Sequence, residues 1–281
     1  MKASANAPDP RWTDGRRIAA LRKWHPVWAA FSRPITDLMV RALAPTAGLR
    51  VLDLACGAGE PALSIAAAVG PAGRVTATDL GSELLCIAEE EARDHGITNI
   101  EYKIADAQSL PFSKESFNAV TCRFGLMFFP DCHRALCECR RVLARGGKAV
   151  FLVWGSYEQP FWQATVGILG KYIQLPEIPP DEPHIFRFAE SGKVVRVMQH
   201  AGFDSAREER VTLPLAWPDF PRNLWTYFSE SSGQYRQFVE QLTKENWENA
   251  ACDAEKLLAE YFDGQQLKLP VEVILATGIR A

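Results

Sequence analysis

The sequence predicts a doubly wound α/β fold with a mostly parallel, seven-stranded sheet, an antiparallel hairpin at one edge and a helical lid. Between residues 49 and 154, continuously apolar strands alternate with helix-length segments. This alternation is typical of a parallel sheet that is covered by helices on both faces. The last two predicted strands lack the crossover pattern of a parallel pair, which indicates that they form the edge hairpin.

The individual elements follow from apolar runs and from glycine-containing stops. The predicted strands are 49–54, 74–79, 100–105, 117–123, 147–154, 206–215 and 267–278. The predicted helices around this sheet are 60–69, 81–95, 131–143 and 190–201. The turns 70–73 and 145–147 contain glycine and are predicted to end helices. The core is therefore expected to begin near Leu49.

Three segments outside the sheet are helical and aromatic, and they hold most of the eight tryptophans. The predicted division is an N-terminal lid segment (1–45), core (46–156), a lid insertion (157–189), core (190–216), a second, helical lid insertion (217–264) and the final core strand (265–281). Pro26 and Pro34 are expected to interrupt the first segment. Open α/β sheets bind ligands outside the carboxyl ends of their strands, so we expect one lid over that edge. The alternative is that the tryptophans only pack the lid's own interior.

The composition is that of a globular protein, with 47% hydrophobic and 23% charged residues and a net charge of −3. Nucleic-acid binders usually carry a basic excess, so a nucleic-acid partner is not expected. The basic residues near the N-terminus are predicted to form a solvated helix face, namely Arg11, Arg16, Arg17, Arg22 and Lys23. No apolar run approaches the roughly 20 residues of a membrane helix, and the first ten residues lack an apolar signal region. Cytoplasmic residence is expected, and the oligomeric state is left open.

Seven cysteines are present without any C-x-x-C pair, so no metal site is expected. Three of them, Cys132, Cys137 and Cys139, lie on one predicted helix. Free cysteine is commonly a small buried hydrophobe, which is the simpler interpretation. Binding of a thiophilic metalloid is the alternative, and the role of this cluster is left open.

The most informative segment is 51–61, which predicts a buried strand, a glycine turn and the start of a helix. Asp79 lies twenty residues after Gly59, at the end of the next strand, where a carboxylate can accept hydrogen bonds from ribose hydroxyls. The turn also fits the G-x-G-x-x-G/A pattern of dinucleotide-binding enzymes. Asp53 argues against a dinucleotide, because a carboxylate so close would repel a pyrophosphate. A cationic nucleoside such as S-adenosylmethionine (SAM) suits both acids.

Four stretches occur in a recognisable order: V-L-D-L-A-C-G-A-G (51–59), A-T-D-L (77–80), A-D-A-Q-S-L-P-F (105–112) and R-V-L-A-R-G-G-K (141–148). With them, the chain resembles the class I SAM-dependent methyltransferases. It is most similar to their small-molecule branch, which resembles the ubiquinone/menaquinone-biosynthesis methyltransferases. The resemblance implies a Rossmann-like core with SAM as the cofactor.

The resemblance also implies cofactor contacts at the ends of the first four strands. Each of three acids would hold one part of SAM: Asp53 the methionine end, directly or through water, Asp79 the ribose, and Asp106 the adenine amino group. The other positions would contact SAM through the backbone or an apolar side chain, namely Ala55, Cys56, Gly57, Gly59, Leu80, Ala107 and Arg123. The alternative for Asp53 or Asp79 is a helix N-cap.

Residues 123–129 follow the fourth strand and are mostly apolar and aromatic. Methyltransferases that act on nucleic-acid bases or glutamine amides commonly carry Asn/Asp-Pro-Pro-Tyr/Phe at this place, and this chain does not. A largely apolar or aromatic acceptor is therefore expected, the alternative being that Leu126 and Phe128 only pack the lid. The predicted substrate contacts are Trp24, Trp28, Phe124, Met127, Trp154 and His184.

Methyl transfer from SAM is an in-line displacement, which depends on alignment and exclusion of water more than on acid–base chemistry or a metal. Histidine is the natural general base near neutral pH. His25, in the aromatic N-terminal segment, is the candidate catalytic residue. A purely structural role is the alternative.

The sequence thus predicts a SAM-dependent methyltransferase that methylates carbon, oxygen or sulfur of a small, largely apolar or aromatic acceptor. The first alternative is a fold relative that binds SAM but performs other chemistry, or none. The second is an NAD-dependent oxidoreductase, which Asp53 and Asp106 disfavour. The third is a non-enzymatic interaction protein.

Overall fold

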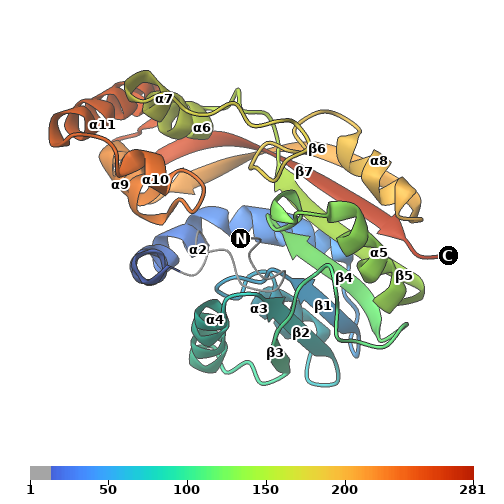
Figure 1. Ribbon diagram of the computed structural model, residues 1–281. Coiled ribbons are helices and arrows are strands. Elements are labelled where there is room, and N and C mark those ends of the chain that lie inside the picture. Colours follow the sequence, from blue (N-terminus) through green and yellow to red (C-terminus); the bar gives the residue numbers. More distant parts are fainter. Residues whose placement is uncertain (1–13) are drawn as a thin grey trace.

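The computed structural model describes residues 14–281, which contain a seven-stranded sheet in the order β3-β2-β1-β4-β5-β7-β6 (Figure 1). The strands are β1 (Arg50–Leu54), β2 (Arg74–Asp79), β3 (Ile100–Ile104), β4 (Phe117–Arg123), β5 (Leu143–Trp154), β6 (Asp204–Trp217) and β7 (Leu267–Ile279). β1 to β5 pair in parallel, and β7 runs antiparallel to both β5 and β6. The predicted doubly wound fold with an antiparallel edge hairpin is confirmed.

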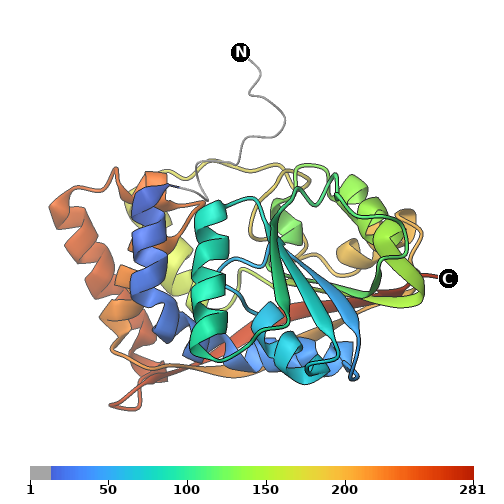
Figure 2. The ribbon, with the colours of Figure 1, turned by 90° about the horizontal axis from the view of Figure 1, so that it is seen from below.

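Helices cover both faces of the sheet (Figures 1 and 2). One face carries α2 (Gly15–Leu43), α3 (Ala62–Val69) and α4 (Ser82–Asp94), and the other carries α5 (Cys132–Val142) and α8 (Lys193–His200). The central strands are consequently buried on both sides, as residues 51–54 of β1 and 149–154 of β5 illustrate. This double burial is the physical reason why these strands are continuously apolar in sequence.

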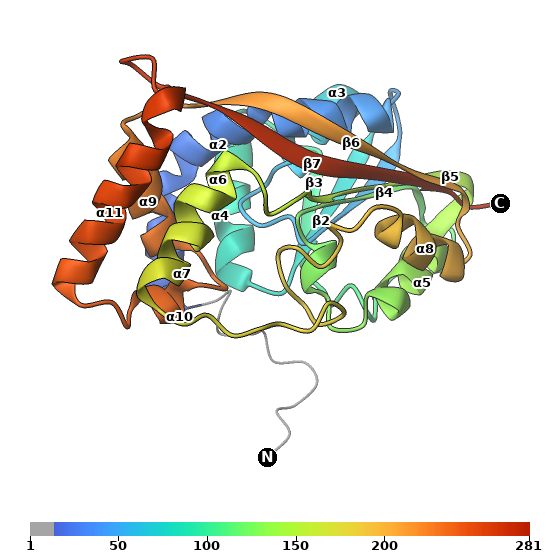
Figure 3. The ribbon, with the colours of Figure 1, turned by 90° about the horizontal axis from the view of Figure 1, so that it is seen from above.

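The remaining helices gather at one end of the long β6–β7 hairpin (Figure 3), and we call them the lid. They are α6 (Pro160–Trp162), the π-helix η2 (Gln163–Gly167), α7 (Ile168–Tyr172), α9 (Pro221–Ser231), α10 (Arg236–Val239), α11 (Lys244–Leu258) and the 3-10 helix η3 (Ala259–Tyr261). A further 3-10 helix, η1 (Leu126–Phe128), follows β4. Within residues 14–281, no helix has the length and apolar character needed to cross a membrane.

α2 is one continuous helix that contains two prolines. The expectation that Pro26 and Pro34 interrupt this segment is wrong, because an internal proline bends a helix without ending it when packing holds both halves. Figure 2 shows the bend: the first part of α2 runs beside α4, and the second part crosses the sheet. Phe31 and Met39 in the second part are 0% exposed. The core therefore begins within α2 and not near Leu49.

The segment after α5 also differs from the prediction. β5 begins at Leu143, directly after α5, whereas the sequence predicts a turn at 145–147. The pairing of β4 with β5 shifts register between Phe117 and Ala119. Gly146, with a φ of 74°, lies in the resulting irregularity of β5. A β-bulge uses the positive φ of glycine as a turn does, which is why the two look alike in sequence.

Candidate functional site

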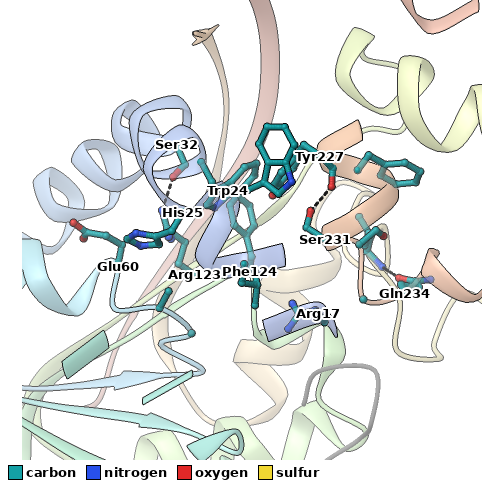
Figure 4. Close-up of a pocket in the computed structure, with 18 of the residues that line it drawn as sticks. Arg17, Trp24, His25, Ser32, Glu60, Arg123, Phe124, Tyr227, Ser231 and Gln234 are labelled. Atoms are coloured by element: carbon teal, nitrogen blue, oxygen red, sulfur yellow. Dashed lines mark hydrogen bonds between the residues drawn. The ribbon is translucent and has the colours of Figure 1, made fainter. Parts of the chain in front are cut away.

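A cavity of about 280 Å³ lies at the carboxyl ends of β1 and β4 (Figure 4). The loop 55–58 after β1 and the residues after β4 form one part of its wall, and α2 and the lid form the rest. The order of the strands reverses between β1 and β4. Open α/β sheets bind ligands at such a point, so this cavity is the candidate active site.

The loop after β1 presents its backbone to the cavity. Ala55 and Gly57 have positive φ angles of 51° and 55°, and strain at a non-glycine residue often marks a functional site. A Cβ atom added to Gly57 would meet no atom within 4 Å, so this position faces open space. Asp79 fixes the loop, because its Oδ2 accepts from the Gly57 amide and its Oδ1 from the Gly81 amide, each at 3.0 Å. The loop is a preformed cradle.

Asp53 comes shortly before this loop and is 0% exposed. The Thr121 hydroxyl donates to Asp53 Oδ1 at 2.6 Å, whereas Oδ2 is buried and has no hydrogen-bond partner within residues 14–281. Burial raises the pKa of Asp53 to about 7, and the Thr121 hydroxyl and the positive charge of Arg123 oppose this shift. A buried carboxyl group with one unpartnered oxygen suits a ligand that brings positive charge nearby.

Arg123 ends β4, and its side chain borders the cavity. Its Nη1 donates to Thr36 Oγ1 at 2.8 Å and to Ser32 Oγ at 3.3 Å, so the guanidinium joins β4 to α2. Burial lowers the pKa of Arg123, and the negative charges of Glu60 and Asp53 oppose this shift. The sequence predicts only a main-chain contact here. The structure adds a cationic side chain that positions α2 over the site.

Much of the remaining wall is aromatic. Phe124 follows β4 with a positive φ of 60° and stacks on Trp154, with ring centroids 4.1 Å apart and ring planes at 8°. Trp28 of α2 stacks on Tyr227 of α9, with centroids 5.3 Å apart and planes at 12°. Trp24 borders the same cavity. The structure therefore brings four of the predicted substrate residues together, and their flat apolar faces suit another planar ring.

Comparison with known proteins decides the family. Residues 22–178, more than half of the chain, match the model of the ubiE/COQ5 methyltransferase family. The demethylmenaquinone methyltransferase of Staphylococcus aureus is 30% identical over 198 residues, which are 67% of this chain and 78% of that enzyme. The chain belongs to the ubiE/COQ5 methyltransferase family. It is a SAM-dependent small-molecule methyltransferase, as the resemblance in sequence implies.

Two further relatives extend the comparison. The ubiquinone/menaquinone biosynthesis C-methyltransferase of Sinorhizobium fredii is 38% identical over 135 residues, or 47% of this chain. That match spans about half (52%) of the length of the relative. Among solved structures, the YcgJ protein of Bacillus subtilis has a TM-score of 0.59 at 22% identity, over 88% of this chain and 98% of that protein. This likeness shows that the methyltransferase has the Rossmann-like class I fold.

The residues around the cradle fit SAM, the methyl donor of this family. The open space at Gly57 and the unpartnered Asp53 oxygen suit a cationic ligand lying on the loop. Leu80 and Ile104 are large apolar residues that are 42% and 62% exposed at the ends of β2 and β3. Exposed apolar side chains at this edge suit a flat adenine ring. Ile104 is not among the predicted cofactor residues, although the isoleucine directly before the 105–112 motif is visible in the sequence.

Several predicted cofactor residues do not border the cavity of the methyltransferase, namely Asp53, Gly59, Asp79, Leu80, Asp106 and Ala107. Asp79 reaches it indirectly, through its bond to the Gly57 amide. Asp106 Oδ1 accepts from the backbone amide of Gln108 at 2.8 Å. Gly59 has a packing role, because a Cβ there would lie 2.8 Å from Leu63 Cδ1 of α3.

The remaining predicted catalytic and substrate residues lie in three different places. His25 borders the cavity, whereas Met127 is 0% exposed in the core and does not border it. His184 borders a second cavity, of about 760 Å³, beside the proline-rich loop 175–184. Burial lowers the pKa of His184. Gln234 borders both cavities, so they adjoin, but neither Met127 nor His184 reaches the acceptor wall.

The predicted solvated face of α2 needs one correction. Arg16, Arg22 and Lys23 are exposed as expected, and Arg11 lies outside the described residues. Arg17 instead borders the cavity. Burial lowers its pKa to about 10, and the charges of Tyr227 and Asp79 oppose this shift. The helical spacing 17, 21, 24, 28 puts Arg17 on the face of Trp24 and Trp28, a signal that was available in the sequence.

α2 also links the lid to the core. Glu230 of α9 accepts from Lys23 Nζ at 2.8 Å and from Trp24 Nε1 at 2.6 Å. On its other side, Arg22 pairs with Glu90 of α4. The part of α2 that borders the cavity therefore contacts both the lid and α4 of the core.

The cysteine cluster lies apart from this site. Cys132 and Cys139 are buried in α5, as the simpler interpretation holds, whereas Cys137 is exposed. Within residues 14–281, no group of three or more histidine, cysteine or acidic side chains is arranged to hold a metal ion.

Proposed function

We propose that this methyltransferase acts on a small, largely apolar or aromatic acceptor, at carbon, oxygen or sulfur. The observation that carries the proposal is the juxtaposition, in one cavity, of the glycine loop after β1 with the stacked rings of Phe124 and Trp154. The loop offers a cradle for the donor, and the rings offer a flat apolar surface for the acceptor. Two reactants held side by side in this way react as one bound unit.

The donor residues are assigned from the same geometry. Loop 55–58 would hold the methionine part of SAM, with Asp53 near its positive charge. Asp79 would hold the ribose, because each carboxylate oxygen can accept a second hydrogen bond besides the one from a loop amide. Leu80, Ile104, Asp106 and Ala107 would surround the adenine. When bound, SAM supplies a methyl group on a sulfonium that leaves as a neutral thioether.

The protein itself would contribute alignment and exclusion of water. Trp24 and Trp28 enclose the cavity from α2, Tyr227 from α9 and Phe161 from α6. We infer that the lid closes over the acceptor against α2, as mobile elements do when they complete a site. Neither a metal ion nor a nucleic acid is part of this proposal.

The name of one relative supports carbon as the methylated atom, and the names of both point to a quinone-type acceptor. One is a C-methyltransferase of ubiquinone/menaquinone biosynthesis and the other a demethylmenaquinone methyltransferase. A planar quinol ring matches the stacked aromatic wall. We therefore favour the ring carbon of a quinol-type acceptor, with oxygen and sulfur as the alternatives.

Asp79→Ala is expected to weaken the binding of SAM and S-adenosylhomocysteine about 10- to 150-fold, since hydrogen bonds to a charged group contribute roughly 1.5–3 kcal/mol. Isothermal titration calorimetry measures this, with thermal unfolding as the check that the variant folds. Asp94→Ala, at the exposed end of α4, is the control and should bind like the wild type. Binding of NAD without any response to SAM would overturn the cofactor assignment in favour of an oxidoreductase.

Turnover tests the reaction itself. The protein is incubated with methyl-deuterated SAM and a panel of quinols, phenols and thiols, and mass spectrometry detects transfer of the label. We expect transfer to planar aromatic acceptors before aliphatic ones. Binding of SAM with no labelled product from any acceptor class would favour the alternative of a fold relative with other chemistry.

A further inference from the structure

His25 of α2 contacts Glu91 of α4 at the edge of the cavity. Its Nδ1 lies 3.1 Å from Glu91 Oε1, and the two side chains are 16% and 28% exposed. The ring of His25 borders the cavity, and Figure 4 shows it on the same side as Glu60 and Arg123. Glu91 does not border the cavity. A cavity-lining imidazole is thus backed by a carboxylate.

This contact determines which ring nitrogen carries hydrogen. The negative charge of Glu91 lies nearest to Nδ1, so it favours the form of the ring that carries its hydrogen on Nδ1. Nε2 then keeps its lone pair. Within residues 14–281, no protein group forms a hydrogen bond with Nε2. An imidazole that is oriented by a carboxylate and has its second nitrogen free has the arrangement of a general base.

The other charged groups near the ring have partners of their own. Glu90 of α4 pairs with Arg22 of α2. Glu60, on the loop side, accepts hydrogen bonds from the first turn of α3. Arg123, on β4, donates to two hydroxyl groups of α2. The positive charge that forms when the imidazole accepts a proton is therefore balanced chiefly by Glu91.

We propose that His25 and Glu91 form a general-base dyad that removes the proton from a hydroxyl group of the acceptor. The inference rests on the proposed methyl transfer and deepens it by naming the group that is deprotonated. His25 is the catalytic residue, because its Nε2 takes the proton of the acceptor. Glu91 is a positioning residue, which orients the ring and stabilises its protonated form.

In the proposed reaction the acceptor is deprotonated before it is methylated. The O–H bond of the acceptor breaks, its proton moves to Nε2 of His25, and the electron pair stays on the oxygen and spreads into the ring. A bond then forms from the oxygen or the adjacent ring carbon to the methyl group, while the methyl–sulfur bond breaks and the sulfonium becomes a thioether. After methylation at carbon, that carbon loses its hydrogen as a proton and the oxygen regains one. Overall, one proton passes to solvent.

The base limits the class of acceptor. Imidazole is matched to hydroxyl groups of phenolic acidity and poorly matched to aliphatic alcohols. The stacked rings of Phe124 and Trp154 favour a planar molecule in the same cavity. Both features point to phenols and quinols.

Four variants test the dyad. With a phenolic acceptor, His25→Ala is expected to lower turnover about 10²- to 10⁴-fold, the usual contribution of a general base, while SAM affinity changes less than about threefold. Glu91→Gln should lower turnover less than His25→Ala does, because the ring keeps its base nitrogen but loses the carboxylate that orients it. Glu90→Gln breaks the neighbouring α2–α4 pair and is the matched control. His184→Ala, in the second cavity, is the histidine control, and both controls should retain near wild-type turnover.

A series of acceptors separates catalysis from packing. Fluorinated phenols of increasing acidity need the base less, because more of each is already ionised at the assay pH. The loss of turnover in His25→Ala relative to the wild type should therefore shrink steadily along the series and vanish for a fully ionised phenol. An equal loss for every acceptor, or no loss at all, would overturn the dyad while leaving the methyltransferase assignment intact.

NMR tests the dyad without an assay of turnover, because it reports which nitrogen of the His25 ring carries hydrogen. The ¹⁵N NMR spectrum of the protein bound to S-adenosylhomocysteine should show His25 with hydrogen on Nδ1, and this preference should be lost in Glu91→Gln but kept in Glu90→Gln. Hydrogen on Nε2 in the wild type would contradict the proposal. Because the spectrum needs no acceptor, it gives this answer even if the acceptor panel yields no product and the proposed function fails.

Discussion

Gly57→Val is expected to lower the affinity for SAM at least about 100-fold, equivalent to roughly 2.7 kcal/mol, and to leave the protein folded. Gly57 borders the cavity, and a Cβ at this position would meet no protein atom within 4 Å. The valine side chain would therefore extend into the space of the donor without clashing with the fold. Calorimetry with SAM and thermal unfolding measure the two effects separately.

Two other glycines provide controls for this variant. Gly96, after α4, has a φ of 66° and equally open surroundings, so Gly96→Val carries the backbone strain without the obstruction. Gly59→Ala would place a Cβ 2.8 Å from Leu63 and should lower the free energy of unfolding more than it lowers SAM affinity. Equal losses of SAM affinity in Gly57→Val and Gly96→Val would show that the loop is not the donor cradle.

Asp53 is expected to give the protein a stability that falls as the pH rises from about 4 to 7. The pKa of Asp53 is about 7 in the folded protein, against 3.8 for the free side chain. Between these values the folded state holds a proton that the unfolded chain has lost, so the free energy of unfolding decreases with pH and is lowest above pH 7. The full difference is on the order of 4 kcal/mol. Denaturant unfolding at a series of pH values measures it.

Asp53→Asn should remove this decrease in the free energy of unfolding with rising pH. The variant should match the wild type near pH 4 and exceed its free energy of unfolding at pH 8, because asparagine places no buried charge in the core. Asp37→Asn, in an exposed ion pair on α2, is the control and should keep this decrease. A wild-type protein whose stability does not change over this window would contradict the raised pKa.

The carboxyl group of Asp53 is also expected to make SAM affinity depend on pH. The positive charge of SAM favours the ionised form of Asp53, so binding at pH 6 should release a proton, and SAM affinity should rise with pH up to about 7. Calorimetry in two buffers of different ionisation enthalpy counts the released proton. Asp53→Asn should bind SAM more weakly and release none. Proton release that persists in this variant would have to come from another group.

The sheet and the glycine loop could be predicted because their signals are local. The strand, turn and acid around Gly57 and Asp79 occupy short stretches whose spacing is fixed by one strand–helix unit. Contacts between distant segments could not be predicted in this way. Glu91 meets His25 only because α2 bends and lies beside α4, and nothing in either segment alone shows this.

Two predicted substrate residues lie away from the cavity for the same reason. The sequence predicts substrate contacts for Met127 and His184 because these residues lie in aromatic or proline-rich segments near the lid. Their final positions depend on how η1 and the loop 175–184 turn, which composition does not determine. Arg17 was assigned to solvent because of its charge, although its helical position matches that of Trp24. Position along a helix was here a better guide than residue type.

α2 gives this methyltransferase a practical property. Its second half supplies fully buried core residues such as Phe31 and Met39, and its first half supplies the cavity residues Trp24, His25 and Trp28. An acceptor that rests on the first half therefore stabilises a helix on which the whole fold depends. Ligands that bind only the native state raise the melting temperature by an amount that grows with the logarithm of ligand concentration over Kd. A library of aromatic compounds can accordingly be screened by thermal shift, with S-adenosylhomocysteine present, before any reaction product is known.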